Sequence, residues 1–171
     1  MVIEINRIVK IPEGNEIEIK DFIITAKKDG KKLEKKLPYS KKIKIEIKDG
    51  EIRISNKKPT KKETPHAATL EPPIRNTLEG KNEGYNYKLE ICNVHFPMNV
   101  KIENKKVIIK NFLGEKKDRF AKILDNVEAN MNGTIIELIS TDKESAGQSA
   151  ANIEKATKVR KRDRRVFQDG I

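Results

Sequence analysis

At 171 residues the chain is long enough for one large domain or two small ones. Its net charge of +11 and pI of about 9.6 favour a polyanionic partner, whether nucleic acid or an anionic membrane surface. The sequence has no run of the roughly 20 apolar residues that a membrane helix needs. Its one cysteine excludes an internal disulfide or a multi-cysteine zinc site. We therefore expect a soluble, cytoplasmic protein with no membrane partner.

The first half of the chain has the two-residue alternation that is typical of short, half-buried strands, for example over Ile43, Ile45 and Ile47. Asp29-Gly30 and Asp49-Gly50 suit tight type I′ turns, because both residue types adopt positive φ at low cost. The pattern therefore predicts antiparallel hairpins.

A helical composition follows over residues 67–79, but Pro72-Pro73 lies in its middle. Proline lacks an N–H donor and crowds the preceding turn. We therefore expect a helix that starts near Pro73, or a broken one, ended by Gly80 and Gly84. The same glycines place a domain boundary near residue 84, between a first repeat over 1–84 and a second over 85–171.

The second half repeats the first at an offset of 83 to 87 residues. Any two hairpin sheets rich in Lys and Ile look alike, but the constant order and spacing favour a true duplication. The matched positions include Ile43, Ile45 and Ile47 with Val127, Ala129 and Met131; Ile52 and Ile54 with Glu137 and Ile139; Leu33 and Leu37 with Phe120 and Leu124; and Asp49-Gly50 with Asn132-Gly133. The predicted fold class is α+β, a tandem duplication of a small antiparallel sheet with one helix packed on it.

A helix is predicted from about Lys143 to Lys158, capped by Thr141 or Asp142. Gly147 costs this helix about 1 kcal/mol relative to Ala and allows close packing on a sheet. The face that would meet the sheet has small side chains at three- and four-residue spacing: Ala146, Ala150, Ile153 and Thr157.

Cys92 and His95 are the one pair that suggests a metal site or a nucleophile. Zinc requires four ligands, and no further cysteine is present. Their odd separation places the two side chains on opposite faces of a strand, and no orienting acid or cleft is evident nearby. We expect a core cysteine and a loop histidine, with no metal, no cofactor and no enzymatic activity.

Four of the chain's eight arginines lie between residues 160 and 165, in a sequence that otherwise favours lysine. Cations after a helix can simply complement its dipole, but one or two are enough for that. Six neighbouring cations repel one another unless anions bind them, and the arginine fork pairs bidentately with phosphate. We therefore predict RNA phosphate contacts for Lys158, Arg160, Lys161, Arg162, Arg164 and Arg165.

Gly114 opens a second basic segment that contains Lys116, Lys117 and Arg119. It can be an ordinary turn with a solvated, lysine-rich tip, or a turn whose backbone lies close to phosphates. These residues by themselves leave both interpretations open. The lysines of the first half are interleaved with acids, which is typical of a solvated face.

Three blocks, at residues 94–100, 111–116 and 165–171, resemble the large-subunit ribosomal protein L-six family in its archaeal and eukaryotic branch, which is named L-nine in eukaryotes. The resemblance implies a duplicated fold and a structural constituent of the large ribosomal subunit. Such a protein binds large-subunit rRNA near the sarcin–ricin loop and the translation-factor site, mainly through its second domain, beside neighbouring ribosomal proteins. It has no catalytic residues. The resemblance supports the turn at Gly114 as an rRNA contact and adds His95, Gln148 and Asn152.

Two features depart from the family pattern. The first helix is usually uninterrupted, and the pattern continues past Asp169-Gly170-Ile171 with a tyrosine and a basic tail. Composition is equally compatible with an alternative, a nucleic-acid-binding regulatory module that acts outside the ribosome.

Overall fold

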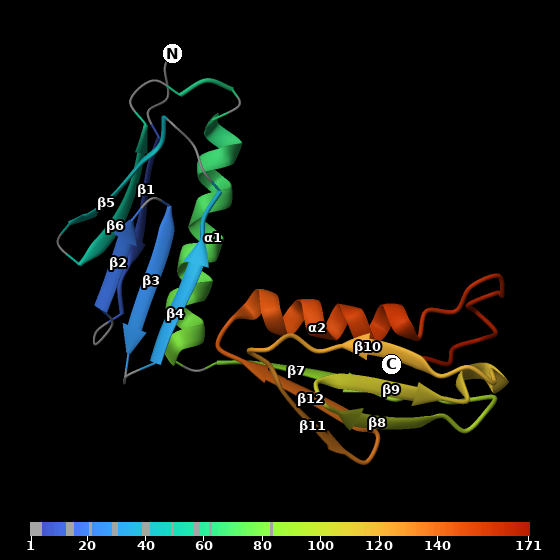
Figure 1. Cartoon of the computed structure of the whole chain (residues 1–171). Helices are drawn as coiled ribbons and strands as arrows, with labels where there is room; N and C mark the ends of the chain where they lie inside the picture. The colour runs from blue at the N-terminus through green and yellow to red at the C-terminus, as the bar shows by residue number, and fades with distance from the viewer. Residues whose placement is uncertain are drawn as a thin grey trace. The chain divides into compact units, whose positions relative to one another are not determined.

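The structure is a computed structural model that describes residues 5–12, 16–20, 22–28, 31–38, 42–48, 50–56, 59–61, 63–82 and 84–171. Its contacts divide the chain into two compact units, Met1–Glu83 and Gly84–Ile171 (Figure 1). Within the described residues each unit contains six strands and one α-helix, and neither helix is long and apolar enough to cross a membrane. The α+β fold class predicted from the sequence is confirmed.

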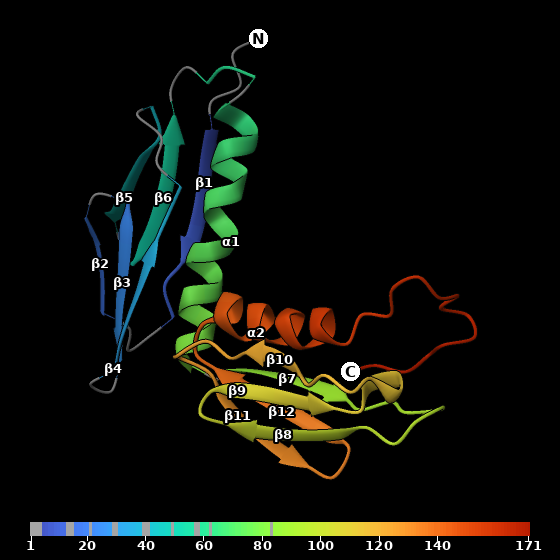
Figure 2. The ribbon, with the colours of Figure 1, turned by 45° about the vertical axis from the view of Figure 1, so that its right-hand side comes forward.

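The first unit has two antiparallel three-stranded sheets, with strand orders β1-β6-β5 and β2-β3-β4. Helix α1 packs against β1, β3 and β4 and runs alongside β1 (Figure 2). The elements are β1 (Ile5–Lys10), β2 (Glu16–Lys20), β3 (Ile23–Lys28), β4 (Lys31–Lys36), β5 (Lys44–Lys48), β6 (Glu51–Asn56) and α1 (Glu63–Asn82).

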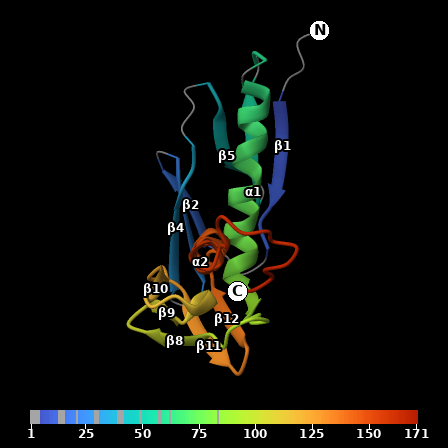
Figure 3. The same cartoon turned by 90° about the vertical axis from the view of Figure 1, so that its right-hand side faces the viewer.

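The second unit has the same topology, with sheets β7-β12-β11 and β8-β9-β10 and a helix that packs on β10, β12 and β7. Figure 3 shows α2 nearly end-on above these strands. The elements are β7 (Tyr85–Glu90), β8 (Asn99–Glu103), β9 (Lys106–Lys110), the 3₁₀ turn η1 (Phe112–Gly114), β10 (Arg119–Lys122), β11 (Glu128–Asn132), β12 (Ile135–Ser140) and α2 (Lys143–Ala156). The matching strand orders show the repeat that the sequence predicts.

The burial of matched residues shows where the predicted alignment of the two halves was right and where it was wrong. Ile43 and Val127 are both buried, and Ile47 and Met131 are both about two-fifths exposed, so that match is confirmed. The match of Ile52 and Ile54 with Glu137 and Ile139 was wrong, because the buried apolar residues of β12 are Ile136 and Leu138. Shifting the alignment by one residue assigns every side chain of the strand to the opposite face of the sheet.

The match of Leu33 with Phe120 was also wrong. Leu33 is buried and lies opposite Ala26 of β3 in the sheet, whereas the Phe120 side chain is 61% exposed. Its neighbour Ala121 is the residue of β10 that faces the core. Strand alternation therefore directs the Phe120 ring away from the core.

The predicted turn at Asn132-Gly133 is displaced by one residue. Asn132 pairs with Ile135 at the end of the β11–β12 ladder, so the two-residue turn is Gly133-Thr134. Gly50, in the equivalent hairpin, has φ +71°, as a tight turn requires. Asp49 and the predicted Asp29-Gly30 turn lie outside the described residues.

Helix α1 continues through Pro72 and Pro73, so the predicted break was wrong. The prolines remove the donors to the carbonyls of Ala68 and Thr69. Both of those residues are at least partly exposed, so water can bond to their carbonyls. Continuity is favoured by apolar side chains that are buried on both sides of the prolines. Leu70, Ile74 and Leu78 contribute about 2 kcal/mol each, and the smaller Ala67 contributes about 0.8 kcal/mol.

Helix α2 is capped by Asp142, one of the two predicted residues. Its carboxylate accepts hydrogen bonds from the backbone N–H groups of Glu144 and Ser145. Gly147 faces the Tyr87 ring of β7, where a Cβ would lie 3.4 Å from the Tyr87 hydroxyl oxygen, an ordinary contact distance. The predicted sheet-facing residues are all buried: Ala146, Ala150, Ile153 and Thr157.

Candidate nucleic-acid interface

The segment after α2, residues 158–165, is termed the arginine strip below. It is not helical, and Lys161 has φ +58°. Val159 is buried within the strip and fixes its backbone to the core of the second unit. The predicted phosphate-binding cations are all exposed: Lys158, Arg160, Lys161, Arg162, Arg164 and Arg165. The exposed cations are therefore carried by a backbone segment that Val159 attaches to the core.

The strip belongs to a loop that is closed at its base. The Ile171 backbone N–H donates to the Thr157 hydroxyl at 3.1 Å, and Thr157 caps the end of α2. Gly170 pairs with Cys92 through two backbone hydrogen bonds of 2.8 and 2.9 Å. In Figure 2 the red loop leaves the end of α2 and returns toward the C-terminus. Both ends of the loop are thus held by the second unit.

Asp169 ties this loop to the loop that contains His95. Its Oδ1 accepts hydrogen bonds from the backbone N–H groups of Val94 and His95 at 2.8 and 3.0 Å, and its Oδ2 lies 2.6 Å from His95 Nδ1. Burial of the carboxylate raises its pKa, but the hydrogen bonds from His95 and Val94 outweigh burial and lower the pKa of Asp169 below its ordinary value. Asp169 is therefore a buried, ionised anchor.

An aromatic stack positions one arginine of the strip. The His95 and Phe167 rings are stacked, with centroids 4.8 Å apart and planes inclined by 26°. On Phe167 lies the guanidinium of Arg162, 4.8 Å from the ring centroid. This cation–π contact reduces the freedom of Arg162 while leaving the residue exposed.

Asp163 organises the turn at the middle of the strip. Its carboxylate accepts hydrogen bonds from the backbone N–H of Arg165 at 2.9 Å and from the Arg165 guanidinium, and these bonds lower the pKa of Asp163. Its backbone carbonyl accepts from Phe167 at 2.9 Å. The Arg165 side chain remains 91% exposed, so the pair shapes the turn without burying the cation.

Arg119 is held by protein groups. Its guanidinium donates to both carboxylate oxygens of Glu115, at 2.8 and 2.6 Å, and to the carbonyl of Ala156 at 2.7 Å. It also lies 4.3 Å from the centroid of Phe112. These contacts join η1 and β10 to the end of α2, which makes Arg119 a residue that positions the start of the arginine strip.

The turn at Gly114 lies against the loop of His95. Gly114 has φ +78°, and a Cβ there would lie 3.7 Å from the Phe96 ring. Asn111 donates from its side chain to the Pro97 carbonyl at 2.9 Å. The turn thus brings its exposed cations, Lys116 and Lys117, to the loop that Asp169 anchors.

The two amide side chains predicted on α2 bond to each other. Gln148 donates to Asn152 at 2.8 Å, and Asn152 donates to the Lys122 carbonyl of β10 at 3.0 Å. Asn152 therefore links α2 to the sheet, whereas Gln148 is exposed.

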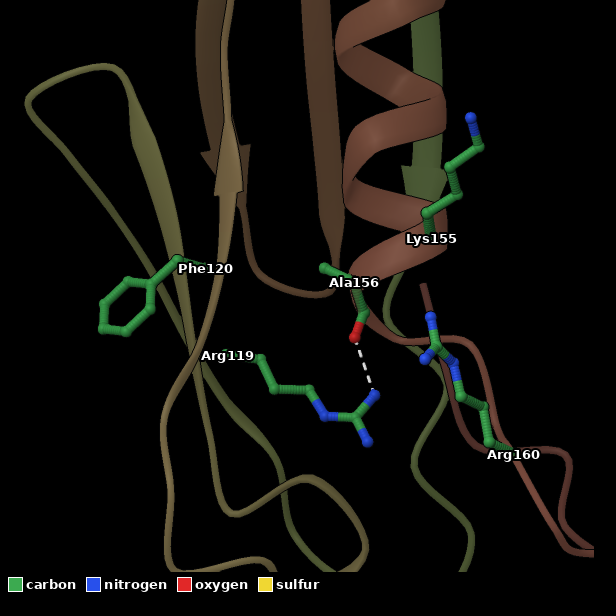
Figure 4. A pocket seen from close by; sticks show the side chains of 5 residues that line it. All are labelled: Arg119, Phe120, Lys155, Ala156 and Arg160. Carbon is green, nitrogen blue, oxygen red and sulfur yellow. Dashed lines mark hydrogen bonds between the residues drawn. The ribbon is translucent and has the colours of Figure 1, made fainter.

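A pocket of about 330 Å³ lies between β10 and the end of α2 (Figure 4). Arg119 and Phe120, adjacent on β10, point to opposite sides of their strand. The lining residues are Arg119, Phe120, Lys155, Ala156 and Arg160. Phe120 and Lys155 were not among the predicted site residues. The sequence feature that could have identified Phe120 is its alternation with Ala121, which assigns the aromatic ring to the outer face.

Cys92 is exposed, so the expectation of a core cysteine was wrong; it pairs through its backbone with Gly170. His95 lies in a loop, as predicted. In the part of the chain that the structure describes, no three His, Cys, Asp or Glu side chains group closely enough to hold a metal ion.

The family profile and the relatives that match this chain all describe the same ribosomal protein. The family profile described as ribosomal protein L6 matches residues 96–170, which include most of the interface. The large ribosomal subunit protein uL6 of Methanosarcina mazei is 40% identical over 171 residues, covering all of this chain and 97% of that protein. The uL6 protein of Methanococcus vannielii is 39% identical over 163 residues, covering 95% and 89% of the two chains. Similarity of this extent, along the whole duplicated fold, shows that the chain belongs to the ribosomal protein L6 family.

Proposed function

We propose that this protein is a structural constituent of the large ribosomal subunit that binds large-subunit rRNA through its second unit. Its location is then the cytoplasmic ribosome, next to other large-subunit proteins. Its rRNA contact is placed near the sarcin–ricin loop and the translation-factor site. The observation that carries the proposal is the arginine strip, with six exposed cations on a loop that is closed at both ends. Anchored cations lose less conformational entropy on binding phosphate than cations on a free tail would.

The contact surface extends beyond the strip. Asp169 holds the His95 loop, and Phe96 packs on Gly114, so the basic turn with Lys116 and Lys117 belongs to the same folded region. Arg119 and Asn152 contribute by holding β10 to α2, and Gln148 is available on the exposed side of the helix. Contacts of this kind fix the position of a protein on RNA without reading base sequence.

The test compares two variants that lose the same charge. One is Arg160→Gln, Arg162→Gln, Arg164→Gln and Arg165→Gln combined. The matched control combines Lys10→Gln, Lys36→Gln, Lys44→Gln and Lys61→Gln, which are exposed lysines of the first unit. Binding to an rRNA fragment that contains the sarcin–ricin region is measured as a function of salt concentration.

Each phosphate contact contributes about 0.7 to 0.9 to the slope of log K against log salt, so losing four should reduce the slope by about 3 in the arginine variant. The lysine control should keep the slope of the parent protein. Equal affinity of the arginine variant and the parent protein would refute the assignment. Sedimentation of a cell lysate separates the proposal from a regulatory role outside the ribosome, because a ribosomal protein travels with large subunits.

A further inference from the structure

The outer face of the sheet β8-β9-β10 has an aromatic centre. Phe120 lies opposite Ile108 in the ladder, and Ile108 lies opposite Lys101 on β8, so these three residues form one row across the sheet. The residues on either side of Phe120 and Ile108 along their strands include the buried Ala121, Val107 and Ile109. Since side chains alternate across a strand, the row faces away from the core. Phe120 is 61% exposed there.

Cations surround this row. In the next row Lys122 lies directly opposite Lys106, and Lys106 lies opposite Glu103. On the other side Lys110 lies opposite Asn99 and forms an ion pair of 3.3 Å with Asp118. Like charges that face each other across a ladder are destabilising. Glu103 faces Lys106 from the other side, so this row keeps one net positive charge, which favours an anion beside Lys122.

The pocket beside α2 extends this surface at the edge of the sheet. β10 is an edge strand, and the pocket on its other side is lined by Arg119, Lys155 and Arg160 as well as by Phe120, whose ring points away from Arg119 (Figure 4). The exposed ring of Phe120 therefore lies beside the lysines of its own sheet face, and the cations at the end of α2 lie across the edge strand from it. Single-stranded nucleic acids bind proteins through this combination, in which bases stack on aromatic rings and phosphates bind cations.

We propose that Phe120 is a stacking platform for an unpaired RNA base, whose flanking phosphates bind the lysines of the outer sheet face and the cationic pocket. The ligand class is a nucleotide that is unstacked from its neighbours, because a paired base does not expose its ring face. The inference rests on the proposed function for the identity of the RNA, but it adds a second contact surface that the arginine strip does not provide.

The absence of tryptophan from the sequence makes a direct test available. Phe120→Trp introduces a single indole whose fluorescence is quenched when a base stacks on it. The matched control is Ile135→Trp, because Ile135 is 41% exposed on the other sheet of the same unit, between Asn132 and Glu90. The probes are transcribed large-subunit rRNA and a perfectly paired RNA duplex, each titrated into the full-length variant.

We expect rRNA to quench the indole of Phe120→Trp and the duplex to leave it unchanged, with no change for Ile135→Trp. Affinity for rRNA should fall about five- to hundredfold in Phe120→Ala and should be retained in Phe120→Tyr. Phe120→Leu should lose as much affinity as Phe120→Ala, because it keeps apolar area without a ring. Since Phe120 is exposed, the melting temperatures should match that of the parent protein.

Parent-like affinity of Phe120→Ala together with an unquenched Phe120→Trp would overturn the inference, and so would retained affinity in Phe120→Leu. A separate variant, Arg162→Gln, Arg164→Gln and Arg165→Gln combined, has no substitution in the pocket. If it loses affinity while Phe120→Ala does not, only the stacking site fails. If neither variant loses affinity, the proposed rRNA contact fails as well.

Discussion

Nδ1 of His95 lies 2.6 Å from Oδ2 of Asp169, although 74 residues separate the two in the chain. The Asp169 side chain is only 3% exposed, and its other oxygen accepts two backbone N–H groups of the His95 loop. This contact joins the segment after β7 to the segment that follows the arginine strip. The surface that we propose for RNA therefore depends on a buried carboxylate.

Asp169→Asn should lower the free energy of unfolding of the second unit by about 2 kcal/mol, because the charged acceptor of these hydrogen bonds is replaced by a neutral amide. The amide keeps the size of the carboxylate, so packing is preserved. Urea unfolding, followed through the NMR signals of the core residues Ile136 and Leu138, measures the change. A variant as stable as the parent protein would show that the Asp169 contacts contribute little.

The stability difference between the parent protein and Asp169→Asn should depend on pH. The pKa of Asp169 is lowered in the folded state, so its contribution is complete above the unfolded value of about 4 and is lost as pH falls through the folded pKa. The difference should be constant above about pH 5 and should shrink toward pH 3. Other carboxylates titrate in both proteins and cancel. A difference that stays constant down to pH 3 would contradict the lowered pKa.

Arg119 and Glu115 should be energetically coupled. Arg119→Met should cost about 2 to 3 kcal/mol, because it removes the donor to the Ala156 carbonyl and the contact with the Phe112 ring. A double-mutant cycle with Glu115→Gln should give a coupling energy of about 1 kcal/mol, since the pair is partly exposed. Additive effects of the two substitutions would show that their ion pair has no net stabilising role.

Pro72→Ala should stabilise the first unit by about 2 kcal/mol, because alanine restores the donor to the Ala68 carbonyl within a continuous helix. Pro65→Ala is the matched control: Pro65 lies in the first turn of α1, where backbone N–H groups have no partner within the helix. It should change stability by a few tenths of a kcal/mol. Destabilisation by Pro72→Ala in thermal unfolding would mean that the helix needs the proline.

Particular residues show how far the fold follows from the sequence. The duplication, the strands and the cap at Asp142 depend on local patterns, and the structure has them. The strand alignment failed at Ile52, because a period of two repeats itself and does not indicate which residue of the second half faces the core. The continuity of α1 through Pro72 also escaped prediction, because packing on the sheet outweighs the local cost of proline.

Some residues of the candidate site could likewise be predicted from the sequence, and others could not. The exposed cations from Lys158 to Arg165 follow from composition, because six neighbouring positive charges have no place in a core. The roles of Arg119 and Asn152 could not be read from the sequence, since their partners, Ala156 and Lys122, lie 30 or more residues away. Phe120 was missed because the repeat alignment matched it with Leu33, which is buried, whereas the Phe120 side chain is exposed.

The sequence by itself determined that the chain is basic, that it is built from two α+β repeats, and that its arginines gather after the last helix. Only the tertiary structure decided that Arg119 is held by protein groups and that Asp169 joins the His95 loop to the segment after the strip. The physical reason is that charge and periodicity are local properties of a chain, whereas burial and hydrogen-bond partners arise between residues that folding brings together.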